Sequence, residues 1–226
     1  PWYKGEAPAR SDYALYPGTY EYKYPKAGEN NSKVSVLSFD IKSRVTRTMK
    51  VPLDADGYIP RIQFAGEKDR LIVSTLNRHQ NRLDFYAVNA RSTQAQLILR
   101  EENKRYVDEC SYQDVNFKDG NFVIISDRDG YRHLYLYSAG GQLIKQLTSG
   151  NYEVTQYYGK SADGKYFYYA SNEGSPLEQY VYRVDSAGRK TKLSARKGTN
   201  SAIFSANCTY YINVYSDINT PAVYTI

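Results

Sequence analysis

The sequence predicts an all-β fold, a partial β-propeller built from four-stranded antiparallel blades. Three observations support this prediction. A strand, turn and strand pattern recurs along the chain, both faces of the clearest strands are apolar, and 25 of the 226 residues are tyrosines, which suit a pleated, half-buried surface. No stretch shows the 3.6-residue apolar period and the capping residues of an amphipathic helix.

The clearest copies of the repeat begin at Asp119 and Asp163, 44 residues apart. The first reads DGNFVIISDRDGYRHLYLY and the second DGKYFYYASNEGSPLEQYVYRV, and each continues through a polar turn, a short strand, a turn and another strand. An earlier copy spans residues 68–102, with residues 71–74 in the place of residues 123–126. A period of about 40 to 50 residues with four short strands is typical of a propeller blade.

The repeats divide the chain into successive units. Because a propeller closes into a ring to remove its sheet edges, and the end units are incomplete, we expect a longer parent chain with further blades. The predicted parts are an arm over residues 1–24, a blade remnant over 25–57, three blades over about 58–112, 113–157 and 158–205, and a second remnant over 206–226.

The stretch YRHLYLY, residues 131–137, predicts a strand that is buried on both faces. Side chains of a strand alternate between its two faces. Leu134 and Leu136 therefore share one face, and Arg132 has the same parity at the start of the strand. Both faces are largely apolar, as a blade stacked between two neighbours requires, so we expect the two leucines to lie between adjacent blades. The Asp129-Gly130 pair predicts a tight hairpin turn.

Charge and hydropathy exclude two classes of partner. The 30 Lys and Arg against 24 Asp and Glu give a formal net charge of +6. The basic residues are scattered, whereas nucleic-acid binding needs a clustered patch. No apolar run approaches the roughly 18 to 20 residues that span a membrane. The chain begins with neither Met nor a signal-peptide apolar stretch, and we expect it to be a piece of a longer protein.

Residues that could perform chemistry are few. No G-x-S-x-G nucleophile elbow occurs, so we predict no catalytic residue in this chain. His79 and His133 each lie in a hairpin-like region, and we interpret both as hydrogen-bonded structural residues. Cys110 and Cys208 are too few for a disulfide framework and lie in different repeat units, so we expect two free thiols.

Two acidic motifs are also interpreted as structural. Glu101 and Glu102 are adjacent, and adjacent residues of a strand point to opposite faces, so we do not expect them to act as a pair. The sequence Asp-Arg-Asp-Gly at residues 127–130 lacks the third acidic ligand and the final Glu of a calcium loop. We interpret it as a turn, and the sequence predicts no metal and no cofactor.

Four stretches resemble a known family. They are YPKAGENNSKVSVLSFD, YIPRIQF followed by NRHQNRLDFYAVN, ISDRDGYRHLYLY, and YFYYASNEGSPLEQYVYRV. Together they are similar to the later blades of the N-terminal β-propeller of dipeptidyl peptidase IV, in the prolyl oligopeptidase clan, and most of all to its bacterial branch. The resemblance extends in order over nearly the whole chain, and YPKAG and SNEG are its most specific pieces.

The resemblance implies a function for a longer parent protein. In that family the propeller caps an α/β-hydrolase domain whose Ser, Asp and His remove dipeptides with Pro or Ala in the second position. That domain is absent from these 226 residues, and the family's two glutamates for the substrate ammonium are expected upstream of Pro1. We therefore expect a non-catalytic chain that shapes the substrate cavity and gates access for short peptides. Its expected partners are the hydrolase domain and peptide substrates. The resemblance also implies a homodimer, which would form through the arm at residues 1–24.

The resemblance also implies a site and a location. A family segment that lines the far side of the substrate pocket falls near residues 106–110, and it implies that Tyr106, Asp108 and Glu109 line the cavity. The sequence here, Tyr-Val-Asp-Glu-Cys, lacks the aromatic and arginine pair of animal members. The few cysteines agree with a bacterial periplasmic or cell-surface enzyme. The alternative is a stand-alone, TolB-like propeller that binds proteins through its funnel.

Overall fold

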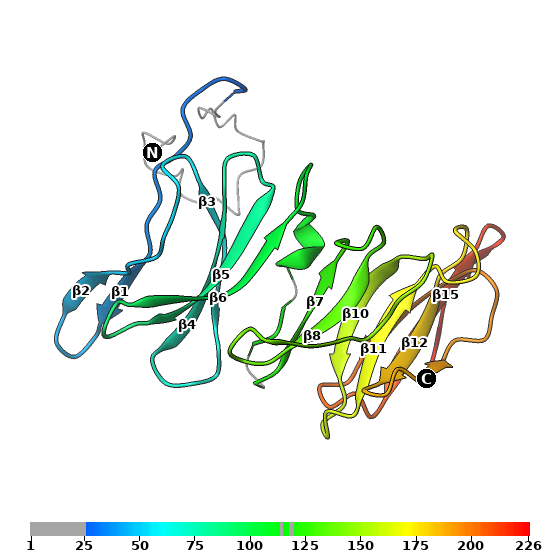
Figure 1. Cartoon of the computed structure of the whole chain (residues 1–226). Helices are drawn as coiled ribbons and strands as arrows, with labels where there is room; N and C mark the ends of the chain where they lie inside the picture. The colour runs from blue at the N-terminus through cyan, green and yellow to red at the C-terminus, as the bar shows by residue number, and fades with distance from the viewer. Residues whose placement is uncertain (1–25, 114, 118–119) are drawn as a thin grey trace, which may run out of the picture.

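The computed structural model describes residues 26–113, 115–117 and 120–226, and its regular structure there is antiparallel β-sheet with one short 3-10 helix (Figure 1). The all-β prediction is confirmed. The predicted arm, residues 1–24, lies outside the described residues. No helix in the described part of the chain is long and apolar enough to cross a membrane.

Five sheets follow one another along the described chain, and within each sheet the hydrogen-bonded neighbours are also neighbours in sequence. Such meanders need only short hairpins between strands. The sheets are β1 (Leu37–Asp40) and β2 (Val45–Thr48); β3 (Tyr58–Phe64), β4 (Arg70–Leu76), β5 (Arg82–Asn89) and β6 (Ala95–Glu102); β7 (Phe122–Ser126), β8 (His133–Tyr137) and β9 (Leu143–Gln146); β10 (Val154–Lys160), β11 (Tyr166–Ser171), β12 (Tyr180–Asp185) and β13 (Lys190–Lys192); and β14 (Thr199–Phe204), β15 (Tyr211–Asp217) and β16 (Thr220–Thr225).

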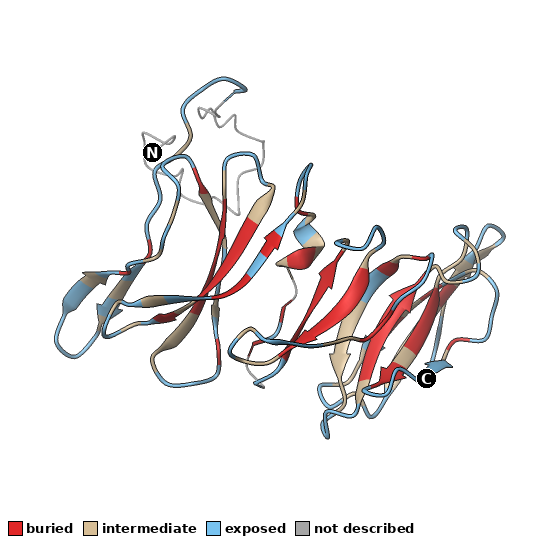
Figure 2. Cartoon of the chain, viewed as in Figure 1, coloured by how far each residue is buried: buried red, intermediate tan, exposed pale blue. Residues whose placement is uncertain are grey.

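The core lies between the sheets, which face one another in sequence order (Figures 1 and 2). On one side of the β7–β9 sheet, Tyr135 and Tyr137 pack with residues of β4, β5 and β6. On the other side, Leu134 and Leu136 pack with residues of β10, β11 and β12. Leu134 is 0% and Leu136 is 7% exposed. The predicted burial of both leucines between neighbouring sheets is confirmed.

Strand pairing corrects two of the predicted blade boundaries. The boundary between residues 157 and 158 falls inside β10, which pairs along its length with β11. The boundary between residues 205 and 206 separates β14 from β15, although these two strands are hydrogen-bonded partners. A sequence period gives the length of a repeat but not its phase. The phase depends on which strands pair. The fourth sheet starts at Val154, within the strand that the predicted boundary divides, and the fifth sheet starts one strand earlier than predicted, at Thr199.

The predicted alignment of residues 71–74 with residues 123–126 is also corrected. The β7–β8 hairpin closes with Ser126 opposite His133, and the β4–β5 hairpin closes with Leu76 opposite Leu83. Leu76 therefore corresponds to Ser126. The predicted alignment placed Ser74 there, two residues earlier. A shift of two residues leaves every side chain on the same face, so the alternation of apolar residues could not reveal it.

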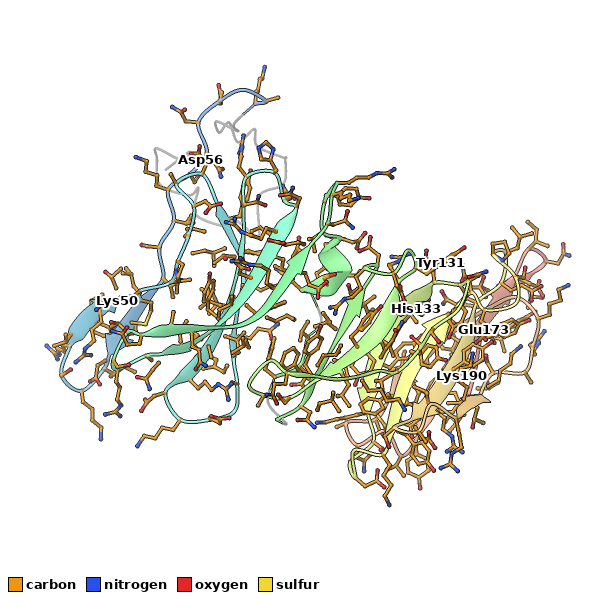
Figure 3. All side chains as sticks on the ribbon, in the orientation of Figure 1. Lys50, Asp56, Tyr131, His133, Glu173 and Lys190 are labelled. Atoms are coloured by element: carbon orange, nitrogen blue, oxygen red, sulfur yellow. The ribbon has the colours of Figure 1, made fainter. Side chains whose placement is uncertain are left out.

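The predicted structural role is confirmed for His133. His133 is buried in β8 (Figure 3), where its Nδ1 lies 3.1 Å from Thr148 Oγ1 and its Nε2 lies 2.9 Å from the Gly150 carbonyl oxygen. His79 is exposed in the turn between β4 and β5. The predicted hairpin turn is also present, since Gly130 has a φ of 101° and its N–H donates to the Asp127 carbonyl at 2.9 Å.

Candidate functional site

The connection between β6 and β7 carries the predicted site residues. It includes the 3-10 helix η1 (Glu109–Ser111), visible beside β7 in Figure 1. Asp108 caps this turn, because its carboxylate accepts a hydrogen bond from the Cys110 N–H at 2.9 Å. Partial burial acts to raise the pKa of Asp108, but the hydrogen bonds from Cys110 outweigh it and leave that pKa below its usual value. Asp108 is therefore ionised at neutral pH.

Asp108 and Glu109 line one cavity of about 290 Å³ between the third and fourth sheets, which we call the interblade pocket. Its walls are apolar at Val115, Val123 and Ile125. Its polar lining consists of Asp108, Glu109, Gln113, Arg132, Thr155 and Gln156, and Cys110 and Tyr157 complete it. A concave site with apolar walls and a few polar groups is the usual form of a ligand pocket.

Charges in and beside the interblade pocket are mainly negative. Arg132 is paired with Glu153, whose Oε2 accepts from the Arg132 backbone N–H at 2.6 Å and lies 3.3 Å from its Nε. Asp108 and Glu109 add two further carboxylates. Burial, and after it the neighbouring Asp108, raises the pKa of the Cys110 thiol to about 12, so the thiol is neutral. Three carboxylates thus accompany one guanidinium.

Tyr106, the third predicted cavity residue, does not share this pocket. Its side chain is 60% exposed and lines a separate, more open cavity of about 550 Å³ together with Lys104, Arg105 and Arg128. Val107, between Tyr106 and Asp108, is buried in the core, and its N–H donates to the Gln80 carbonyl at 2.7 Å. This anchor divides the segment, so that Tyr106 and Asp108 lie on different surfaces.

Sequence reasoning missed the contributions of Arg132, Thr155 and Gln156 to the pocket. Arg132 was interpreted only as the start of a strand, and Thr155 and Gln156 belong to β10, the first strand of the next sheet. Exposed polar residues on a strand give only a weak sequence signal for a binding site. They become site residues only because the fourth sheet stacks beside η1.

Glu101 and Glu102 point to opposite sides, as predicted. Glu102 is exposed, whereas Glu101 is buried, accepts a hydrogen bond from Ser126 Oγ at 2.8 Å and is ion-paired with Arg128. Burial raises the pKa of Glu101, and the Arg128 charge acts against this rise. The pair joins the last strand of one sheet to the β7–β8 turn of the next, which gives Glu101 a structural role.

The remaining potentially reactive groups in the described part of the chain are the two cysteines. Cys110 and Cys208 are free thiols. Within residues 26–113, 115–117 and 120–226, no group of three His, Cys, Asp or Glu side chains is arranged to hold a metal ion.

Successive antiparallel meanders that stack face to face define part of a β-propeller. The family model for the dipeptidyl peptidase IV (DPP IV) N-terminal region matches residues 3–222. The chain belongs to this family, and the resemblance found in the sequence is confirmed.

Solved structures and curated relatives agree with this assignment. The crystal structure of Porphyromonas gingivalis dipeptidyl peptidase 4 is 48% identical, with a TM-score of 0.87 over 94% of this chain and 30% of that chain. The structure of a putative dipeptidyl aminopeptidase IV from Bacteroides ovatus shares the fold, at 24% identity and a TM-score of 0.74 over 90% of this chain and 32% of that one. A probable dipeptidyl peptidase 4 of Aspergillus flavus is 27% identical over 224 residues, 91% of this chain and 28% of the relative. The chain therefore spans about a third or less of the length of these proteins.

Proposed function

We propose that the chain is the non-catalytic propeller portion of a DPP IV-like serine exopeptidase. It forms one wall of the substrate cavity and restricts entry to short peptides. The interblade pocket is the observation that carries this proposal. It is lined in part by β10, the first strand of its sheet, and the blades of a propeller are arranged around a central channel.

The peptidase chemistry in this proposal belongs to an α/β-hydrolase domain elsewhere in the parent chain. The relatives are named as dipeptidyl peptidases and are about three times longer than this chain, which supports a domain of that kind as its partner. The propeller wall supplies steric selection, since a folded protein is too large to enter a channel lined by packed sheets. The bacterial structural relatives support a periplasmic or cell-surface location.

The cavity-lining role is tested at Tyr106 in the full-length parent enzyme. Tyr106→Ala should lower kcat/KM for tri- to hexapeptides that begin with Gly-Pro, because it removes an exposed aromatic contact surface. Tyr210→Ala is the matched control, since Tyr210 is 70% exposed against 60% for Tyr106 but lies near the β14–β15 hairpin. The same kcat/KM in both variants as in the wild-type parent would contradict a role for Tyr106 in the cavity.

A homodimer contact through residues 1–24 is part of the proposal. Deletion of residues 1–16 from the parent enzyme should weaken the dimer, measured as molar mass by light scattering across a dilution series. A dimer with an unchanged dissociation constant would exclude the arm as a main contact.

A further inference from the structure

We propose that the interblade pocket is a subsite for a basic side chain, lysine or arginine, of the peptide substrate. The inference rests on the proposed function and adds a substrate class to it. Three features support it: the size of the pocket, its apolar walls, and the excess of carboxylates in and beside it.

The size of the pocket suits one side chain. Drug-sized ligands occupy pockets of about 300 to 1,000 Å³, and the interblade pocket, at about 290 Å³, lies at the lower end. Its walls at Val123 and Ile125 belong to β7, whose packing on both faces makes them rigid. Lysine and arginine bury an aliphatic stem against such surfaces while the charged end remains at a polar rim.

The charges favour a cation over an anion. Arg132 is the basic residue that lines the pocket, and Glu153 already accepts from both its backbone N–H and its Nε. Asp108 is held in its ionised form by the Cys110 hydrogen bonds. Glu109 is exposed and forms no ion pair within the described part of the chain. A substrate carboxylate would meet three carboxylates and one neutralised guanidinium, whereas a substrate cation would find Glu109 unpaired.

The geometry separates this site from the open cavity at Tyr106. Three basic residues, Lys104, Arg105 and Arg128, and two acidic residues, Glu102 and Asp127, line that second cavity, so its charges are mixed. The two cavities lie on either side of the buried Val107. Of these two cavities, the interblade pocket is the one whose acidic lining residues outnumber its basic ones, so it is the one that suits a basic side chain.

The experiment uses the full-length parent enzyme and pairs of peptides that differ only by lysine against norleucine. Norleucine keeps the aliphatic stem and removes the charge. The exchange is made in turn at the first, third and fourth residues of a peptide with proline second. We expect kcat/KM to favour lysine by about fivefold at one of these positions, the size of a partly exposed ion pair.

The variants test whether the named carboxylates cause the preference. Glu109→Gln should reduce the ratio of kcat/KM for lysine to that for norleucine, and Asp108→Asn combined with Glu109→Gln should bring it close to one. Asparagine also caps a helical turn, so the double variant keeps the turn at η1, and the single variant tests the idea without touching the cap. Glu67→Gln makes the same change of charge on the exposed β3–β4 hairpin and should leave the ratio as in the wild type.

Two results would overturn the inference alone. One is a parent enzyme that cleaves these peptides with no lysine preference at any position, and the other is a preference that survives both variants. A wild-type parent that cleaves none of the proline peptides would instead refute the proposed function, and this inference would fall with it.

Discussion

At the scale of single residues, a close approach between the second and third sheets depends on Gly141. This glycine lies in the turn between β8 and β9 with a φ of 89°. A Cβ added to it would lie 1.5 Å from the carbonyl oxygen of Ile98, in β6 of the preceding sheet. Only glycine fits this position, because both the left-handed backbone and the neighbouring carbonyl exclude a side chain.

Gly141→Ala should therefore destabilise the chain by about 2 to 5 kcal/mol, which combines the cost of a left-handed alanine with that of overpacking. Gly140→Ala is the matched control, since the nearest atom to its added Cβ is Ser138 Oγ at 3.9 Å. Urea unfolding followed by circular dichroism measures both variants. Equal losses of stability would contradict the proposed contact.

Cys110 should be an unreactive thiol in the folded protein. Burial first, and then the nearby Asp108, raises its pKa to about 12. A raised thiol pKa favours the neutral form, so at pH 8 the thiolate is about a thousandfold scarcer than in a thiol with the ordinary pKa near 9. Alkylation of native Cys110, followed by peptide mass mapping, should keep accelerating above pH 10, and Asp108→Asn should speed it.

The same labelling tests the absence of a bridge between the cysteines. Under denaturing, non-reducing conditions both Cys110 and Cys208 should be alkylated, with two adducts per chain. A chain without adducts would disprove free thiols, and fast labelling of native Cys110 at pH 7 would disprove its burial.

At the scale of elements, β8 shows how one strand serves two cores. Tyr137 stacks on Phe122 of β7 with ring centroids 5.4 Å apart, on the side of the second sheet. Leu134 and Leu136 point the other way, toward the fourth sheet. The apolar residues at four successive positions, Leu134 to Tyr137, are thus explained by neighbours on both faces.

Leu134→Ala or Leu136→Ala should cost about 2 to 5 kcal/mol in free energy of unfolding, because each leaves a cavity in the second of these cores. Arg132→Ala should cost much less, since its side chain is about a third exposed and lies before the strand begins. Chemical denaturation of the three variants gives the comparison. A loss at Arg132 as large as at the leucines would show that the strand's faces are wrongly assigned.

Much of the fold was predictable at this scale, and the reason is the two-residue period of a strand. The faces of β8, the turn at Gly130 and the recurring hairpins follow from local pattern. The phase of the repeats did not, because β10 and β14 are assigned to a sheet only by their hydrogen-bonded partners. A local pattern contains no information about those partners.

The candidate site was predictable only in part for a similar reason. The resemblance directed attention to Asp108 and Glu109, and these two do share the interblade pocket. Arg132 and Gln156 complete it from the β7–β8 connection and from β10. Their convergence depends on how two sheets stack, and separation along the sequence hides that.

At the scale of the whole molecule, the sheets are joined by a repeated side-chain contact. Ser38 Oγ donates to the Ala90 carbonyl at 3.0 Å, an Arg70 guanidinium nitrogen to the Ala139 carbonyl at 2.8 Å, and Lys145 Nζ to the Ser186 carbonyl at 2.6 Å. Each bond links one sheet to a hairpin of the next. These hydrogen bonds are directional, whereas the apolar packing between the sheets is not.

The abundant tyrosines and the positive charge are also connected at this scale. The Arg128 guanidinium lies 4.2 Å from the ring centroid of Tyr135, and Lys192 Nζ lies 3.0 Å from that of Tyr180. Lys190 is ion-paired with Glu173, and both lie over the fourth sheet in Figure 3. These three basic side chains therefore lie over tyrosine rings or pair with a carboxylate.

Hydrolysis of a chromogenic Gly-Pro amide, measured side by side for the full-length parent and for the isolated chain of residues 1–226, tests the division of labour between propeller and hydrolase domain. The parent should turn the amide over, whereas the isolated chain should not, because the sequence contains no nucleophile elbow and His133 is buried in a sheet with both ring nitrogens hydrogen-bonded. Activity that follows the isolated chain through repurification, or a parent with none, would contradict the assignment of this chain as the non-catalytic propeller of a dipeptidyl peptidase.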